Sequence, residues 1–303
     1  ELTTAEADFS DYSMAKFVPA SGAATRMFKD LYAFVDSRET TAYVEKFFDN
    51  LSSFAFYGEL TERLDIENMD LEDLDDRITI ANALLNHKMI YGDTPKALIT
   101  FHTYDDSVTT PIDEQIYEGE QYLDGDVKNL HFTIAEKHEE AFNQYVENIL
   151  KTKDNLNITY SFQKKHTDTM AVDMANEPFL LENGEVFYRP GGHGSLLDNL
   201  NDIEEDIIFI KNIDNVAHRT QVEDTIQSKK LLAAIGIQVK EELDGYVKDL
   251  LTDDYDLDEI KEFITNRLKI TLKTDLDKEK ALWFLNRPLR VAGVVKNEGE
   301  PGG

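Results

Sequence analysis

Apolar residues in this chain follow two patterns: short runs typical of buried strands, and longer stretches with helical spacing. The strand-like runs lie at 16–19, 97–101, 131–134, 157–162, 207–210 and 289–295. Helical spacing covers 40–87, 136–150 and most of 216–268, and Thr110 with Pro111 predicts the cap and first residue of a further helix. The alternation predicts an α/β fold, in which helices cover both faces of a mostly parallel sheet.

The helical stretch 40–87 is interrupted by an acidic break at 65–76. Its expected apolar face carries Tyr43, Phe47, Leu51 and Phe54. Strand-like runs precede and follow this stretch. We therefore interpret residues 36–92 as a helical insertion into a single domain that spans 1–303.

The densest group of glycines in the chain is Arg-Pro-Gly-Gly-His-Gly, which ends with Gly192, His193 and Gly194. Glycine lets a ligand lie against backbone N–H groups, and several glycines make a loop costly to order, so packing explains them poorly. His193 could donate to a phosphate or a sugar hydroxyl. Shortly afterwards, the apolar run 207–210 leads to Asp214 within Asn-x-Asp-Asn, at the sheet edge where open α/β folds bind ligands. These features predict a site for a phosphorylated ligand and a divalent cation, although Asp214 could also be a simple turn residue.

The first predicted strand, 16–19, leads into a turn of small residues and then into a predicted helix. This arrangement presents the N–H groups at the start of a helix to phosphate oxygens. Ser21, Gly22 and Thr25 would lie along a nucleotide, and Arg26 would neutralise phosphate charge. A strand-to-helix turn also needs small residues for packing alone, so the turn has a purely structural interpretation as well.

Two lysines and a glutamine add polar groups beside predicted strands. Lys96 precedes the run 97–101 and could reach a phosphate as a mobile point charge. Gln163 and Lys164 follow the run 157–162 in a locally basic turn. The amide of Gln163 offers a donor and an acceptor, which suits the edge of uracil or thymine, and Lys164 could contact a phosphate. The alternative is that these residues lie in ordinary solvated turns.

Charge and composition exclude several classes of function. The 31 Lys and Arg residues stand against 60 Asp and Glu residues, a net charge of −29, which argues against a partner that is nucleic acid or an anionic membrane. The sequence has no cysteine, which removes disulfides and cysteine nucleophiles and fits a reducing compartment, so we expect a cytoplasmic protein. The motifs of P-loop NTPases, dinucleotide oxidoreductases and most hydrolases do not occur in the sequence. Glu1 is not a natural start, and the sequence stops in what resembles another glycine-rich turn, so we expect a fragment of a longer protein that is truncated at its C-terminus.

In their order along the chain, these residues resemble the motifs of the nucleotidyltransferases that make nucleotide sugars, the UDP-sugar pyrophosphorylases. Residues 17–27 resemble their signature of a strand followed by Gly-Gly-x-Gly-Thr-Arg, and Lys96 with its preceding proline resembles their Pro-Lys. Gln163 is similar to the glutamine that reads uracil in that family. Residues 190–194 resemble its Pro-Gly-His-Gly loop, and 209–215 its strand ending in Asn-x-Asp-Asn. The chain as a whole also resembles a bacterial family of unknown function, common in Bacteroidetes and distantly related to these enzymes.

The resemblance implies a Rossmann-like sandwich of the glycosyltransferase-A type, built on a mixed, mainly parallel sheet. It also implies a sugar-1-phosphate uridylyltransferase, in which UTP and a sugar 1-phosphate give a UDP-sugar and pyrophosphate with Mg²⁺ as cofactor. Arg26, Lys96 and Lys164 would be the catalytic cations, and Asp214 would hold Mg²⁺. The nucleotide-binding residues would be Ser21, Gly22, Thr25, Gln163, Gly192, His193 and Gly194.

Two alternatives remain open at the level of sequence. Ser21 and Ala24 stand where the pyrophosphorylase signature has glycines, which favours a catalytically inactive module that binds a nucleotide-sugar. The other alternative is a glycosyltransferase that uses a nucleotide-sugar as donor and releases UDP. The sequence does not name the sugar or the base.

Overall fold

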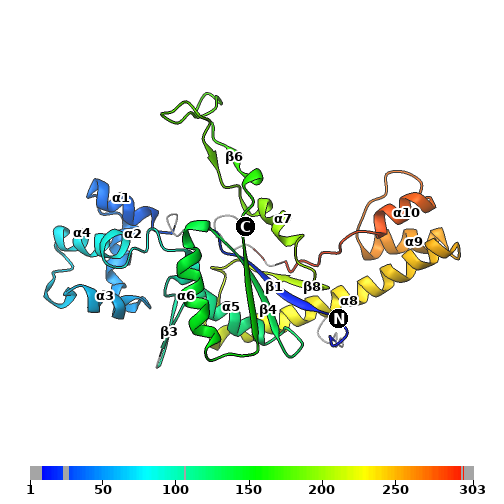
Figure 1. The fold of residues 1–303 in the computed structure, drawn as a ribbon, viewed down its shortest axis with the longest axis horizontal. Helices are drawn as coiled ribbons and strands as arrows, with labels where there is room; N and C mark the ends of the chain where they lie inside the picture. The colour runs from blue at the N-terminus through cyan, green and yellow to red at the C-terminus, as the bar shows by residue number, and fades with distance from the viewer. Residues whose placement is uncertain (1–8, 23–26, 106, 295, 297–303) are drawn as a thin grey trace. The chain divides into compact units, whose positions relative to one another are not determined.

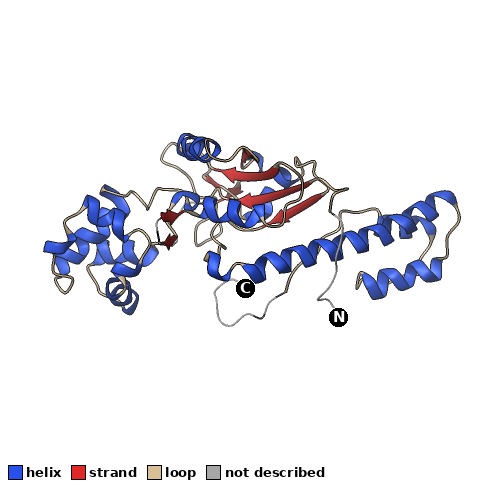
Figure 2. Cartoon of the chain, turned by 90° about the horizontal axis from the view of Figure 1, so that it is seen from below, coloured by secondary structure: helices blue, strands red, loops and turns tan. Residues whose placement is uncertain are grey.

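The computed structural model describes residues 9–22, 27–105, 107–294 and 296. The chain divides into two compact units, Tyr12–Val222 and a unit that combines Glu1–Asp11 with Glu223–Gly303 (Figures 1 and 2). The first unit contains the sheet, and the second is helical in its described part. The hydrophobic pattern of the sequence does not predict this division.

A four-stranded sheet forms the centre of the first unit, and every neighbouring pair of its strands runs parallel. In spatial order the strands are β5 (Leu156–Phe162), β4 (Lys128–Ile134), β1 (Met14–Pro19) and β8 (Ile207–Ile210). All six residues of β1 are buried because β4 and β8 flank this strand. The structure therefore confirms an α/β fold with a parallel, Rossmann-like sheet, and it confirms four of the predicted strands.

Two helices cover one face of this sheet, α5 (Pro111–Glu120) and α6 (Glu139–Leu150). Phe142 of α6 packs against Phe132 of β4 with ring centroids 5.5 Å apart. The expected start of α5 is confirmed: Pro111 is its first residue, and the backbone N–H of Thr110 donates to the side chain of Asp113 in a capping box.

The opposite face of the sheet carries less helix within this unit than expected. The connection from β5 to β8 contains one short α-helix, α7 (Leu197–Leu200), whose Asn199 Nδ2 donates to Ser161 Oγ on β5 at 2.8 Å. Polar side chains therefore line part of this face. The expectation of helices over both faces is corrected to one covered face and one partly covered face.

The order of the strands defines a switch point in the sheet. From β1 the chain moves outward to β4 and then β5, whereas β8 returns to the other side of β1. The connections therefore diverge between the carboxyl ends of β1 and β8. In open α/β sheets, ligands bind outside the carboxyl ends of the strands at such a point.

The stretch between β1 and α5 is mainly helical, as predicted for 40–87. Its helices are α1 (Lys29–Ser37), α2 (Ala42–Asp49), α3 (Tyr57–Arg63) and α4 (Leu74–Asn82). They enclose a hydrophobic cluster of their own. The predicted apolar face is partly wrong: Phe47 and Leu51 are buried, but Tyr43 is 43% exposed and Phe54 is 36% exposed. The buried face of α2 instead carries Val44, Phe47 and Phe48.

The predicted strand at 97–101 is wrong. A 3₁₀ turn, Lys96–Leu98, follows Pro95, and Ile99 directly after it packs into the helical cluster rather than into a sheet. The chain becomes extended only at β2 (His102–Tyr104), which pairs with β3 (Ser107–Thr109) as an antiparallel hairpin.

A second pair of short strands, β6 (Thr169–Met170) and β7 (Tyr188–Arg189), is antiparallel and begins a segment that we call the arm, residues 168–190 (Figure 1). Beyond this pair, Val172 bridges to Pro178 and Leu180 bridges to Val186. The arm connects β5 to the glycine-rich loop.

The second unit consists in its described part of α8 (Glu223–Thr252), α9 (Leu257–Glu262), α10 (Lys278–Leu285) and a π-helical turn after α9. Its buried cluster includes Leu250, Ile260, Ile264, Ala281 and Leu285. The predicted strand at 289–295 is wrong for 289–294, where the structure has no strand. These residues lie along α8, so that a Cβ on Gly293 would be 3.4 Å from Leu232 Cδ1. None of the described helices is long and apolar enough to cross a membrane.

Candidate functional site

Most of the predicted site residues that the structure describes follow the carboxyl ends of three strands. Ser21 and Gly22 follow β1, Gln163 and Lys164 follow β5, and Asp214 follows β8. Thr25 and Arg26 lie outside the described residues. The switch point lies between Gly22 and Asp214.

An ion pair joins Lys96 to the end of β8. Its Nζ lies 2.5 Å from Oδ2 of Asp214, although 118 positions separate the two residues. The side chains are 22% and 35% exposed, so both groups are partly desolvated and still within reach of a ligand. The lysine that the sequence places far from the N-terminal turn thus reaches the carboxylate at the switch point.

The glycine-rich loop is attached to the end of β5. Gln163 Nε2 donates to the carbonyl oxygen of Gly191 at 3.1 Å. A Cβ on Gly191 would lie 1.9 Å from Ser195 Oγ and 2.9 Å from the carbonyl oxygen of Thr167, so packing does explain this glycine.

The other two glycines of the loop have no such explanation. A Cβ on Gly192 or Gly194 would meet nothing within 4 Å in the part of the chain that the structure describes. His193 lies between them, exposed, at the start of a 3₁₀ turn, His193–Leu196. The backbone of this half of the loop is therefore open to a ligand.

Lys164 is already paired in this structure. Its Nζ lies 2.8 Å from Oδ2 of Asp202 and donates to the carbonyl oxygen of Asp198 at 3.1 Å. Contact with a phosphate would require Lys164 to leave Asp202. The partner of Lys96 is the carboxylate at the switch point itself, so Lys96 is the better placed cation there.

Sequence reasoning missed a buried ionic network behind this edge. Glu118 of α5 pairs with Lys16 of β1, Nζ to Oε1 3.2 Å, and with Lys211 after β8. At most 8% of each of these side chains is exposed. Burial alone would raise the pKa of Glu118, but the two ammonium groups outweigh it and hold the pKa of this carboxyl below its usual range. The available signal was a lysine inside the otherwise apolar first strand.

A buried glutamine next to this network holds the chain after β8. Gln115 Nε2 donates to the carbonyl oxygens of Asn212 at 2.8 Å and Ile213 at 3.3 Å. The N–H of Ile213 donates to the carbonyl oxygen of Pro19, at the end of β1. These bonds fix the backbone immediately before Asp214 and leave its carboxylate at the edge of the sheet.

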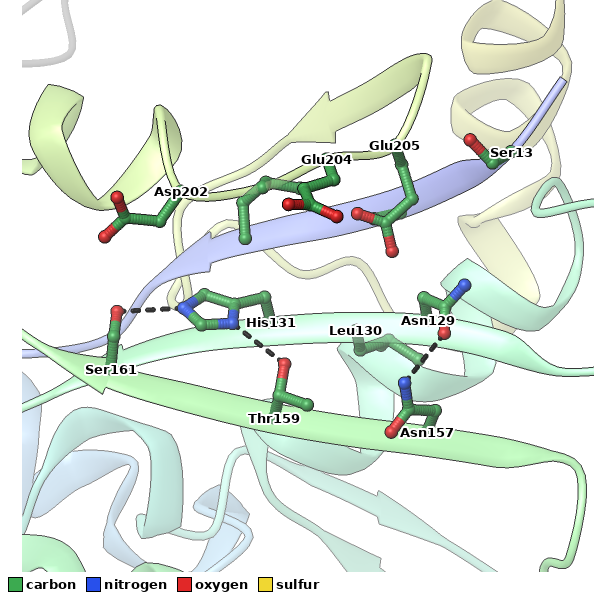
Figure 3. A pocket seen from close by; sticks show the side chains of 12 residues that line it. Ser13, Asn129, Leu130, His131, Asn157, Thr159, Ser161, Asp202, Glu204 and Glu205 are labelled. Carbon is green, nitrogen blue, oxygen red and sulfur yellow. Dashed lines mark hydrogen bonds between the residues drawn. The ribbon is translucent and has the colours of Figure 1, made fainter.

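A polar pocket of about 570 Å³ lies on the less covered face of the sheet (Figure 3). Its lining residues include Asn129, His131, Asn157, Thr159, Ser161, Asp202, Glu204 and Glu205. The ring of His131 bonds to Thr159 Oγ1 at 2.8 Å and to Ser161 Oγ at 2.9 Å. Burial lowers the pKa of His131, and the more distant charge of Asp202 raises it less.

This pocket does not fit phosphate groups. Its lining residues include three carboxylates and neither lysine nor arginine, so a polyanion would be repelled. The edge with Lys96 and the open glycine loop suits a phosphorylated ligand better. We therefore assign the candidate site to the edge rather than to the pocket.

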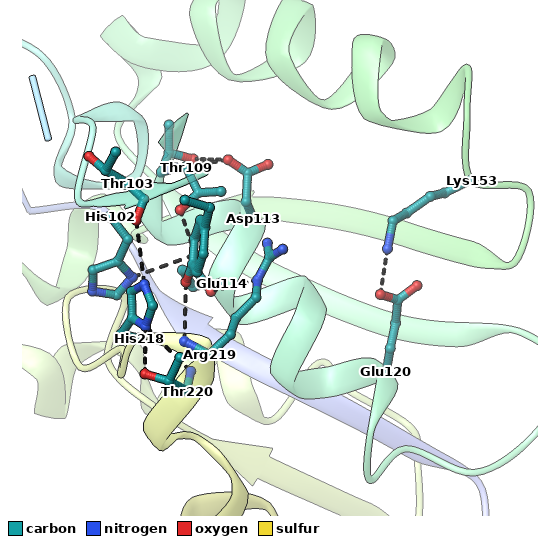
Figure 4. Close-up of polar contacts among 12 residues, drawn as sticks. His102, Thr103, Thr109, Asp113, Glu114, Glu120, Lys153, His218, Arg219 and Thr220 are labelled. Atoms are coloured by element: carbon teal, nitrogen blue, oxygen red, sulfur yellow. Dashed lines mark hydrogen bonds and ion pairs between the residues drawn. The ribbon is translucent and has the colours of Figure 1, made fainter. Parts of the chain in front are cut away.

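A third polar cluster surrounds Glu114 of α5 (Figure 4). Its carboxylate accepts from Tyr104 Oη at 2.9 Å, from Thr109 Oγ1 at 2.5 Å and from Arg219 Nε at 3.3 Å. The ring of His218 stacks on Tyr104 with centroids 4.4 Å apart. Because three donors of the same unit satisfy the buried carboxylate, we interpret this cluster as a structural junction between α5 and the β2–β3 hairpin.

A metal ion at the candidate site would need a bound substrate to supply some of its ligands. The described residues contain no group of three or more His, Asp or Glu side chains that could enclose an ion. Mg²⁺, however, is commonly held by one or two carboxylates together with substrate phosphates and water. Asp214 meets that limited requirement if the ion arrives with a nucleoside triphosphate.

Comparison with known proteins gives a family and no function. Residues 2–303 match the family described as Domain of unknown function (DUF4301). No curated protein and no solved structure matches the chain.

Proposed function

The chain belongs to the family described as Domain of unknown function (DUF4301), and we propose that it is a Mg²⁺-dependent nucleotidyltransferase. The proposed reaction joins UTP and a sugar 1-phosphate into a UDP-sugar and releases pyrophosphate. A phosphate oxygen of the sugar 1-phosphate attacks the α-phosphorus of UTP, and the bond from that phosphorus to the pyrophosphate oxygen breaks. The resemblance of the motifs to those of the UDP-sugar pyrophosphorylases supports this reaction. We also propose that the sheet is of the glycosyltransferase-A type.

One observation carries the proposal: the ion pair between Lys96 and Asp214 lies beside the switch point of a parallel sheet. The cation and the carboxylate of this pair can separate when a ligand binds. The cation would then contact the triphosphate, and the carboxylate would contact its metal ion. Attack on a phosphoryl group depends mainly on positioning and charge neutralisation, which such a pair supplies without an acid–base residue.

The chain's own groups have separate roles in this proposal. Lys96 would bind the β- and γ-phosphates as a point charge and stabilise the departing pyrophosphate. Asp214 would hold Mg²⁺, which supplies neutralisation of the phosphate charge when it is bound. Arg26 would add a second cation, and Lys164 a third after release from Asp202.

The nucleoside would lie between Gly22 and the glycine loop. Gly22 has nothing within 4 Å of its Cβ position among the described atoms, as is also true of Gly192 and Gly194. Ser21 would contact the phosphates from the same turn as Gly22. Gln163, which binds the loop at Gly191, would read the base, and His193 would contact the ribose. The alternatives, an inactive nucleotide-sugar module and a glycosyltransferase, use the same edge and differ in what they bind.

A panel of thermal shifts tests the proposal. UTP, dTTP, ATP, GTP and UDP-sugars are each added with and without Mg²⁺, and a ligand at about 100 times its Kd should add about 2.7 kcal/mol of stability. We expect UTP to raise Tm only with Mg²⁺, and the shift to disappear in Asp214→Ala.

The control is a lysine–aspartate pair elsewhere in the same unit. Asp93 pairs with Lys137 at an exposed position, so Asp93→Ala should keep the UTP shift. A shift for UDP-sugars alone would favour the binding module or the glycosyltransferase. A flat panel for every nucleotide would exclude the proposed function.

A further inference from the structure

The polar pocket on the less covered face of the sheet has a floor of polar side chains that packing of the sheet does not require (Figure 3). Strands of parallel sheets are usually apolar on both faces, because helices cover both. Strands β4 and β5 are mainly apolar on the face that α5 and α6 cover, where Phe132 lies. The opposite face carries three pairs of polar residues in register, Asn129 with Asn157, His131 with Thr159, and Thr133 with Ser161.

Hydrogen bonds between the two strands hold the side chains of this floor in place. Asn157 Nδ2 donates to Asn129 Oδ1 at 2.9 Å, and the ring of His131 bonds to the hydroxyls of Thr159 and Ser161. Burial lowers the pKa of His131, so its ring is uncharged near neutral pH. The floor therefore offers uncharged donors and acceptors in fixed positions, and such preorganisation lowers the cost of binding a ligand.

The roof of the pocket is a connecting segment, residues 202–206, that is fixed at both ends. At one end, Asp202 pairs with Lys164, which follows β5. At the other end, Asp206 Oδ2 accepts from the N–H of Ser13 at 2.9 Å and from its hydroxyl at 2.7 Å. The N–H of Asp206 donates back to Ser13 Oγ at 3.0 Å. These bonds hold the segment over the floor.

Two carboxylates face the pocket between the fixed ends of the roof. Glu204 and Glu205 both line the pocket, and neither side chain has a hydrogen-bond or ion-pair partner among the described residues (Figure 3). An ionised carboxylate only accepts hydrogen bonds, whereas the amides and hydroxyls of the floor donate and accept. A complementary ligand therefore needs both donors and acceptors, and it cannot be an anion.

We propose that the polar pocket binds an unphosphorylated sugar. A hydroxyl group both donates and accepts, and a sugar carries one on most of its carbon atoms, so a single ring can bond to the floor and the roof at once. A volume of about 570 Å³ is within the range of small-molecule sites. A protonated amine offers only donors, and a nucleotide brings phosphates that the carboxylates repel.

This sugar site is separate from the edge that holds Lys96 and Asp214. The residues that line the pocket include none of the candidate residues of the edge. The sugar site is therefore independent of the proposed nucleotidyltransferase activity, and either can be wrong without the other.

Saturation-transfer difference NMR of the whole chain measures direct contact with a sugar. Direct contact is the useful readout because sugars also stabilise proteins in general as excluded solutes. The probes are glucose, galactose, mannose and N-acetylglucosamine, each up to about 50 mM, which is well above the Kd of about 1 mM of a weak site. We expect at least one probe to bind, and the binding to persist in Asp214→Ala, which changes only the edge.

Variants in the floor and the roof test where the sugar lies. Asn157 is exposed and Glu205 is partly exposed, so Asn157→Ala and Glu205→Ala should both fold. Each should weaken sugar binding by about tenfold, as expected when a polar group of a site loses its hydrogen bond to a ligand. The matched controls are Asn148→Ala and Glu147→Ala, at exposed positions of α6 on the other face of the sheet, and both should keep wild-type binding.

A second readout locates the sugar without a variant at the contact. His131 is the histidine that lines the pocket, so its Cε1–H signal, assigned with His131→Gln, should shift when the bound sugar is added. Contact with none of the four sugars would overturn the inference, as would binding that Asn157→Ala and Glu205→Ala leave unchanged. Sugar binding that is lost in Asp214→Ala would place the sugar at the edge, and binding of spermidine without any sugar would show a cation site. Either result would also overturn the inference.

Discussion

Glu118 joins two buried lysines in the interior of the sheet unit. Its carboxylate lies between two buried ammonium groups, so Glu118→Leu would remove the counter-charge of Lys16 and Lys211. Breaking a buried ion pair in this way costs about 3–5 kcal/mol. We expect urea denaturation to show a loss of this size. The triple variant Lys16→Met, Glu118→Leu, Lys211→Met should recover most of it, and a triple variant as unstable as the single one would contradict this explanation.

His131 makes stability depend on pH in a known direction. Burial lowers its pKa from 6.5 in the folded chain, so the unfolded chain takes up the proton first as the pH falls. The free energy of unfolding should therefore decrease as the pH falls below about 6.5. His131→Gln, which keeps hydrogen bonding to the hydroxyls, should flatten this decrease in denaturation curves. His87→Gln, at an exposed position, should not, and equal slopes for both variants would refute the assignment.

The glycine-rich loop contains one glycine that packing requires and others that packing does not require, and alanine variants distinguish the two. Gly191→Ala would place a methyl group against Ser195 and Thr167, so we expect a loss of about 1–3 kcal/mol in the free energy of unfolding. Gly194→Ala meets no neighbour among the described atoms and should leave stability nearly unchanged. If the loop contacts the nucleotide, Gly194→Ala should still weaken UTP binding. A Gly194→Ala variant with normal stability and normal UTP affinity would remove this residue from the proposed site.

At the level of elements, the sequence predicts the sheet strands well because each is a short apolar run between polar turns. The strand prediction fails where alternating apolar residues pack against helices instead of lying in the sheet. Ala97 and Ile99 alternate like a strand but are buried among helices, and 289–294 lies along α8. Neither partner can be seen in a window of neighbouring residues.

The candidate site could be predicted only in part, for a similar reason. Gln163 and Asp214 were identifiable because each lies shortly after the end of a strand, and parallel strands end at one edge. The pairing of Lys96 with Asp214 could not be read from the sequence, because it depends on the path of the helical stretch. Gln115 could not be identified from the sequence, because the burial of a polar residue on a helix depends on which face of the helix packs against the sheet.

The whole molecule carries a charge that should itself oppose folding. With a net charge of −29, repulsion among carboxylates destabilises the compact state, and salt screens it. We expect Tm to rise by a few degrees between about 20 mM and about 300 mM NaCl in differential scanning fluorimetry. An uncharged osmolyte at equal osmolarity is the control for general solvent effects. A Tm that falls with salt would indicate that the ion pairs outweigh the repulsion.

The central claim is that Lys96 and Asp214 together bind a nucleoside triphosphate with its metal. Isothermal titration of UTP into the wild type, Lys96→Met, Asp214→Asn and the control Asp93→Asn tests it most directly, with and without Mg²⁺. We expect Mg²⁺-dependent binding in the wild type and the control, an affinity at least about tenfold lower in Lys96→Met, and no Mg²⁺ dependence in Asp214→Asn. Equal UTP affinity and equal Mg²⁺ dependence in all four proteins, or no binding by the wild type, would contradict the account.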